Sequence, residues 1–183
     1  SGPARSRPPR GDRRHRWVTR SFVDLRFETP VVESRLTIQP VELVIFSDLR
    51  ACIVDHLRRN LPFEGVGLLA MQEADRVGAV RAMAYYPGEN ADVSPIRYTM
   101  RRCDVASALR DMDRRGFRLG AVVHSHPRTP PVPSATDLAE AIGPEILSVI
   151  VGFTPVATLR AWQLAGVHGS SDPGYREVRI TDS

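Results

Sequence analysis

One stretch of the chain, residues 120–137, restricts the possible folds and functions more than any other, and it reads GAVVHSHPRTPPVPSATD. Its first part is an apolar run that predicts a buried strand ending at Pro127, because proline cannot donate to a strand ladder. His124 and His126 lie two residues apart, so their side chains leave the same face of that strand, about 6.5–7 Å apart. Two imidazoles in this arrangement can bind one metal ion. Ser125 is expected to point the other way.

The second half of the stretch adds a carboxylate. Residues 128–133 include three prolines, which leave this loop few conformations to lose on folding. Ser134 then opens a predicted helix that runs through Ile142, with Asp137 in its first turn and facing back toward the histidines. Ser134 and Asp137 also match a capping box, in which both side chains bind backbone N–H groups at the start of a helix. Capping explains only this half of the stretch.

The rest of the chain predicts an α+β domain. Apolar periodicity indicates two longer helices, one at 48–59 with Ser47 as its cap and one at 103–115. Short apolar or alternating runs predict strands at 35–38, 41–46, 64–71, 79–86, 96–100, 119–126, 146–153, 157–165 and 175–181. This order favours a curved mixed β-sheet flanked by helices.

Composition narrows the class of protein. A chain of 183 residues with 42% apolar and 25% charged residues is ordinary for one globular domain, and it has no apolar run long enough for a membrane span. Two cysteines without a CxxC pair are typical of a reducing compartment, so a cytoplasmic location is expected. The sequence gives no indication of the oligomeric state.

Residues 1–30 differ from the rest of the chain. They hold eight arginines against three acidic residues, with prolines and glycines between them, and predict a disordered extension before a domain at 31–183. Such an extension is either a solvated segment or a basic handle that contacts the phosphates of a nucleic acid or an acidic partner.

The stretch from His124 to Asp137 resembles the motif of the JAMM or MPN+ zinc metalloproteases, His-x-His-Pro followed after six or seven residues by Ser-x-x-Asp, and it matches that motif without a gap. The family motif also has a distant glutamate before a Gly-Leu-Leu strand. Glu64, in the segment PFEGVGLL, occupies that place. Gly65-Val66 departs from the small residue and cysteine that many members carry there.

The resemblance implies the JAMM/MPN fold, a cytidine-deaminase-like architecture, and a catalytic site. His124, His126 and Asp137 would bind Zn²⁺. Glu64 would act as the general base, and Ser134 would donate to the oxyanion. The implied activity is that of a zinc metallopeptidase or isopeptidase that cuts after the Gly-Gly-type tail of a small ubiquitin-like or sulfur-carrier protein. Only eight residues separate Asp137 from the next predicted strand, which favours a simple prokaryotic-type enzyme.

Two other functions stay open at this point. One is a non-catalytic MPN scaffold, although such members lack the metal ligands. The other is a RadC-like protein that associates with nucleic acid through its basic N-terminal residues. Tyr85, Tyr86, Asn90 and Arg97 are candidates to line a substrate groove, and ordinary sheet packing explains them equally well. The sequence does not indicate which carrier is cut, or whether the bond is a peptide, an isopeptide or a cysteine adduct.

Overall fold

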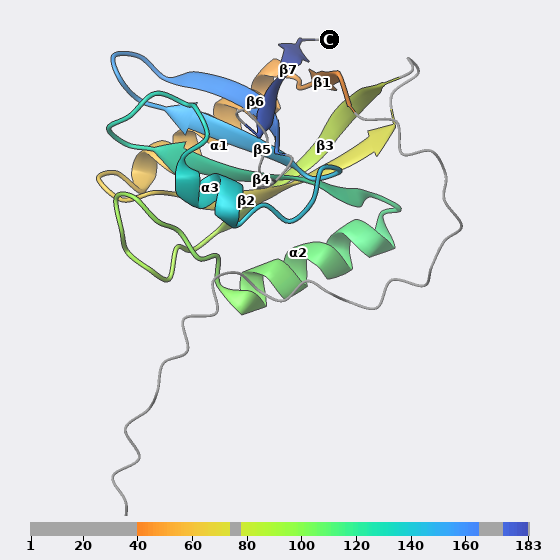
Figure 1. The fold of residues 1–183 in the computed structure, drawn as a ribbon. Coiled ribbons are helices and arrows are strands. Elements are labelled where there is room, and N and C mark those ends of the chain that lie inside the picture. The colour runs from red at the N-terminus through yellow and green to blue at the C-terminus, as the bar shows by residue number, and fades with distance from the viewer. Residues whose placement is uncertain (1–39, 74–77, 165–173, 183) are drawn as a thin grey trace, which may run out of the picture.

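The computed structural model describes residues 40–73, 78–164 and 174–182. Its strands are β1 (Glu42–Val44), β2 (Val66–Glu73), β3 (Ala79–Gly88), β4 (Arg118–His126), β5 (Leu147–Gly152), β6 (Thr158–Leu164) and β7 (Tyr175–Thr181). Its helices are α1 (Ser47–Arg59), α2 (Arg102–Arg114) and α3 (Ala135–Ala139). The described residues therefore form an α+β unit (Figure 1). No helix in these ranges is long and apolar enough to cross a membrane.

The strands form one mixed sheet, as expected, but this sheet closes into a barrel in the order β1-β3-β2-β4-β5-β6-β7. The closure depends on β1, which pairs in parallel with β3 on one side and with β7 on the other. Leu43 at its centre lies opposite both Val80 and Ile180. The expected strand at 35–38 and the expected extension at 1–30 lie outside the described residues.

The central strands β2 and β4 are antiparallel neighbours, and their alternate residues enter two separate cores. One core includes residues from α1 and the other includes residues from α2, and the two helices lie on opposite sides of the sheet (Figure 1). In β4, Val123 belongs to the α1 core and Val122 to the α2 core. Because side chains alternate along a strand, His124 and His126 leave the α2 side of the sheet.

Ser125 points the other way, as the alternation predicts. It is fully buried, and its Oγ accepts a hydrogen bond from the Gly65 N–H at 2.8 Å. The Ser125 N–H in turn donates to the Gly65 carbonyl at 3.1 Å. Gly65 also packs closely against α1, where a Cβ at this position would lie 2.8 Å from Leu57 Cδ2. The segment that precedes β2 is thereby fixed beside the histidine strand.

Three local predictions were wrong. Ser47 does not cap α1: it is the first helical residue, and Phe46 takes the N-cap position without a side-chain hydrogen bond. The helix that begins after Ser134 ends at Ala139, well before Ile142. Residues 96–100 do not form a strand, and only Met100 makes an isolated bridge, to Asn90.

The strand at 96–100 fails for a physical reason. The Asn90 side chain donates to the Arg97 carbonyl at 3.1 Å and accepts from the Thr99 N–H at 3.0 Å. Backbone groups that would otherwise enter a strand ladder are therefore bound by a side chain, and side chains of this type are known to compete with regular structure.

Replacing Ser125 by alanine is expected to lower the free energy of unfolding by about 1–3 kcal/mol, because the buried Gly65 N–H loses its acceptor. The measurement is the urea unfolding midpoint. The control is Thr158→Val, which removes only the exposed hydroxyl bond to the Val156 carbonyl and is expected to change stability by no more than about 0.5 kcal/mol. A Ser125→Ala variant as stable as this control would contradict the structural role given to the Ser125–Gly65 pair.

Candidate metal centre

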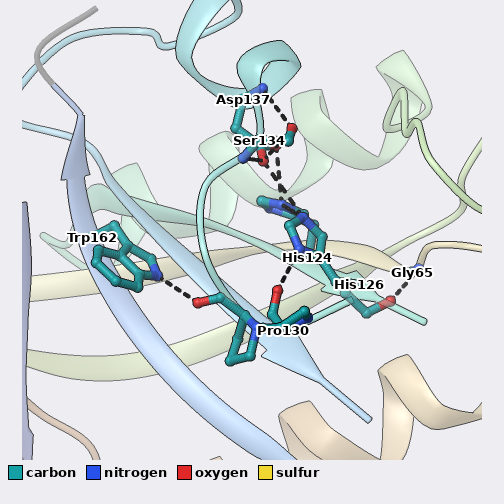
Figure 2. Close-up of polar contacts among 9 residues, drawn as sticks. Gly65, His124, His126, Pro130, Ser134, Asp137 and Trp162 are labelled. Atoms are coloured by element: carbon teal, nitrogen blue, oxygen red, sulfur yellow. Dashed lines mark hydrogen bonds and ion pairs between the residues drawn. The ribbon is translucent and has the colours of Figure 1, made fainter. Parts of the chain in front are cut away.

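The three side chains that the motif singled out as metal ligands converge at one point, with His124 and His126 at the end of β4 and Asp137 in α3 (Figure 2). His124 Nε2 lies 3.2 Å from Asp137 Oδ1, and His126 Nε2 lies 3.5 Å from Asp137 Oδ2. The two Nε2 atoms are 3.3 Å apart. All three side chains are buried. Within the described ranges, this is the group of His, Cys, Asp and Glu side chains close enough to share one ion.

The spacing of the two imidazoles fits a tetrahedral zinc site. Ligand atoms bound to zinc at about 2.0–2.1 Å in a tetrahedron lie about 3.3–3.4 Å from one another, and the two Nε2 atoms, 3.3 Å apart, fit this spacing. Asp137 presents a different oxygen to each histidine, Oδ1 to His124 at 3.2 Å and Oδ2 to His126 at 3.5 Å. Two imidazole nitrogens and one carboxylate oxygen are also a donor set that zinc accepts. The residues present therefore fit this metal in type, and the spacing of the two imidazoles suits it.

The proline-rich loop, residues 128–133, fixes the orientation of His126 through the ring nitrogen that faces away from the centre. Its Nδ1 lies 3.0 Å from the Pro130 carbonyl, and since a carbonyl only accepts, Nδ1 carries the proton of this hydrogen bond. In the neutral ring the lone pair is then on Nε2, which faces the centre. The next carbonyl, of Pro131, accepts from Trp162 Nε1 at 2.9 Å. The loop is thus tied to β6, as Figure 2 shows.

His124 is held differently. Its ring is fully buried, and its Nδ1 has no hydrogen-bond partner among the described residues. The Tyr98 ring stacks on it instead, with centroids 4.5 Å apart and an interplanar angle of 26°. Metal-binding histidines usually have a hydrogen-bonded partner on the second nitrogen, so here packing against Tyr98 takes over the orienting role. Sequence reasoning missed Tyr98, because nothing in its spacing connects it to the motif.

Ser134 and Asp137 form the capping box that their spacing predicts. Asp137 Oδ2 accepts from both the Ser134 N–H and the Ser134 hydroxyl, each at 2.7 Å, and the Asp137 N–H donates to Ser134 Oγ at 3.2 Å. The same carboxylate faces both histidines. The Asp137 side chain therefore caps α3 and also faces the two histidines as the third ligand of the centre.

The charges of the centre are coupled. Burial raises the pKa of Asp137, but hydrogen bonds from His124, His126 and Ser134 outweigh it and bring that pKa well below its usual range. Burial lowers the pKa of His126, whereas Asp137 and the Pro130 carbonyl raise it, with a net increase. For His124, burial dominates and the pKa falls. A metal ion binds the neutral imidazole, so its binding displaces any proton held on His126 Nε2.

Glu64 lies two residues before the start of β2 and is buried, with a relative exposure of 5%. Burial raises its pKa to about 7; the nearby His126 opposes this increase and the nearby Asp137 adds to it. Both of its backbone groups are bound by the segment after β3, since the Glu64 N–H donates to the Ser94 carbonyl at 2.8 Å and the Glu64 carbonyl accepts from Asn90 Nδ2 at 2.9 Å. Its carboxylate is outside the group of converging ligand atoms but within electrostatic reach of it.

The other candidates from the sequence have different environments. Tyr85 packs against the α1 core, and its hydroxyl lies 2.7 Å from His56 Nδ1. Tyr86 packs against the α2 core and donates to Asp111. Both therefore fit the sheet-packing interpretation. Arg97 lies on the segment beside the centre, 4.0 Å from Glu140 just after α3.

Comparison with known proteins gives a consistent result. Residues 46–165 match the family described as prokaryotic homologs of the JAB domain, a range that contains every site residue named above. The chain is 39% identical over 88 residues to a probable TtuB-protein conjugate cleaving protease of Thermus thermophilus, and this alignment covers 47% of the chain and 54% of that protein. It is 34% identical over 109 residues to a CysO-cysteine peptidase of Mycobacterium tuberculosis, covering 60% of the chain and 72% of that protein.

Solved structures agree in fold. Protein DSY2949 from Desulfitobacterium hafniense superposes with a TM-score of 0.65 at 24% identity, over 77% of this chain and 92% of that one. A protein from Salinibacter ruber superposes with a TM-score of 0.57 at 28% identity, over 76% and 90% of the two chains. The family match spans more than half of the sequence, so the chain belongs to the prokaryotic JAB-domain family, as its resemblance to the JAMM metalloproteases predicted.

Proposed function

We propose that this protein is a zinc-dependent peptidase or isopeptidase that cuts after the C-terminal Gly-Gly-type tail of a small ubiquitin-like or sulfur-carrier protein. The observation that carries the proposal is the convergence of His124, His126 and Asp137 at separations of 3.2 to 3.5 Å, within electrostatic reach of a buried glutamate. The relatives support the hydrolase class, since their names describe a conjugate-cleaving protease and a CysO-cysteine peptidase.

The proposed mechanism divides the work among a few side chains. His124, His126 and Asp137 would hold the zinc, and three protein ligands with one open position are typical of a catalytic site. When bound, zinc supplies an activated water and polarises the scissile carbonyl. Glu64 accepts the proton of the attacking water and returns it to the leaving amine. A pKa of about 7 suits both steps, because the ionised and the protonated forms of the Glu64 carboxyl are then both populated at neutral pH.

Ser134 is proposed as the donor to the oxyanion that forms on the scissile carbonyl. Its hydroxyl hydrogen is directed at Asp137 Oδ2 in the structure, so this role requires the hydroxyl to rotate toward the substrate. Asp137 keeps its hydrogen bond from the Ser134 N–H when that happens. A single donor of this kind contributes about 10²–10³ in rate.

The tail of the substrate is proposed to bind as an added strand, which requires an unpaired sheet edge. β3 offers one, because β1 pairs only with its first three residues, Ala79–Arg81. No other described strand covers residues 82–88 of β3 on that side. An extended Gly-Gly tail suits such an edge because glycine needs no side-chain space.

The non-catalytic scaffold is disfavoured, because the ligand set is complete and Glu64 lies within electrostatic reach of it. We also propose that residues 31–183 are the catalytic domain and that residues 1–30 are an extension of it. The cytoplasmic location, the cytidine-deaminase-like architecture and a contact of residues 1–30 with nucleic acid stay predictions.

The purified protein is expected to contain about one zinc per chain. His126→Ala and Asp137→Ala should lose the metal because each removes one of three ligands, whereas Glu64→Gln should keep it. Asp55→Ala is the control, since it removes an exposed carboxylate on α1. Elemental analysis after dialysis measures all five proteins. A parent that stays metal-free after incubation with zinc would exclude a zinc enzyme.

Cleavage is tested on CysO carrying one added C-terminal cysteine and on a peptide fused to the tail of TtuB, with mass spectrometry of the products. The parent should release a carrier that ends at its own tail, and a chelator should stop the reaction. Glu64→Gln should lower kcat by about 10²–10⁴, and Ser134→Ala by about 10²–10³, with zinc retained in both. A zinc-loaded parent that leaves both substrates intact, or a Glu64→Gln variant with parental kcat, would overturn the proposed function.

A further inference from the structure

One loop contacts residues in and around the metal centre at three points. This loop, residues 89–101, connects β3 to α2 (Figure 1). It accepts a hydrogen bond from the Glu64 N–H through Ser94, and it stacks Tyr98 on His124. Its Arg97 lies 4.0 Å from Glu140, which follows the helix that carries Asp137. The loop residues that make these contacts lie outside the sequence motif. The interactions that fix the shape of this loop therefore also affect the geometry of the metal centre.

The shape of the loop depends on the carboxamide of Asn90, which is buried with 7% exposure. Asn90 Nδ2 donates to the Glu64 carbonyl at 2.9 Å and to the Arg97 carbonyl at 3.1 Å. Asn90 Oδ1 accepts from the N–H groups of Asp92 and Thr99, both at 3.0 Å. Two donors and two lone pairs are all that an asparagine side chain offers. Its full capacity is therefore used on four backbone groups.

We propose that Asn90 is a positioning residue for the metal centre: its carboxamide fixes the backbone of Glu64 and folds the loop that places Tyr98 on His124. The inference rests on the proposed function for the role of Glu64. It concerns two members of the site, the base Glu64 and the ligand His124, which Asn90 would support from outside the motif.

The first element is the base. The Glu64 backbone is held at both ends by the loop, with its N–H on Ser94 and its carbonyl on Asn90. Removing the Asn90 donor leaves that carbonyl without this partner, and a buried polar group without a partner is costly enough to shift the chain that carries it. A displacement of about 1 Å in a reacting group lowers a rate by about 10²-fold. The expected signature is a fall in kcat without a matching change in KM.

The second element is the ligand His124. Asn90 binds the backbone on both sides of Tyr98, at the Arg97 carbonyl and at the Thr99 N–H. The Tyr98 ring is thus held in its stacked position over the His124 ring. His124 Nδ1 has no hydrogen-bond partner of its own among the described residues. Loss of an outer partner of a metal ligand typically weakens metal binding by about 10–100-fold. The expected signature is a weaker zinc affinity, which is measured without any substrate.

Two variants test the proposal. Asn90→Ala removes all four hydrogen bonds. Asn90→Asp has the same size and keeps the acceptor for the two N–H groups, but it loses both donors. The matched control is Asp104→Ala, which removes an exposed hydrogen bond to the N–H of the neighbouring Glu89. Each protein is measured for zinc Kd by competition with a chelator, for kcat and KM on the CysO-cysteine substrate at saturating zinc, and for Tm.

Both Asn90 variants are expected to lower kcat by about 10–100-fold with KM changed less than threefold, and to raise the zinc Kd by about tenfold or more. Asp104→Ala should match the parent in Kd and kcat. A folded Asn90 variant with parental kcat and zinc Kd would overturn the proposal, as would a loss of Tm alone. If the parent binds zinc but cuts nothing, the proposed function fails, and an unchanged zinc Kd in the variants still refutes the role of Asn90. A parent that does not bind zinc overturns both.

Discussion

The pair of hydrogen bonds between Ser125 and Gly65 is the contact on which the rest of the site depends. Ser125 is the residue between the two histidines, so it joins the histidine strand to the segment that carries Glu64. Alternation along β4 makes this possible, because it sends the two imidazoles to one side of the sheet and the serine to the other. Two groups sixty residues apart in sequence are thereby held next to one another in a fully buried position.

Each side chain of the centre is also supported by contacts within the protein. The Pro130 carbonyl supports His126, the Tyr98 ring supports His124, and the capping box supports Asp137. A buried carboxylate without partners would be strongly unfavourable. Here hydrogen bonds from both histidines and Ser134 keep the pKa of Asp137 low, so the site is held in its charged form.

The sequence predicted the parts of this structure that local spacing controls. His124 and His126 follow from the period of a strand. Asp137 follows from a helix that starts after Ser134, because it lies three residues beyond that cap. Glu64 could be identified only through the resemblance to a known family, since sequence spacing cannot connect it to the distant histidines. The closure of the barrel was not predicted because it depends on three residues of β1. The strand expected at 96–100 was wrong because the Asn90 side chain binds backbone groups that a ladder would need, and long-range contacts of this kind leave no periodic signal.

The most direct test of the account is a crystal structure of the zinc-loaded protein, with anomalous diffraction collected at the zinc edge. We expect one strong peak at about 2.0–2.1 Å from His124 Nε2, His126 Nε2 and a carboxylate oxygen of Asp137, with a water in the fourth position that is hydrogen-bonded to Glu64. A zinc ion bound elsewhere, or one whose fourth ligand is the Glu64 carboxylate itself, would contradict it, because no open position and no free base would then remain.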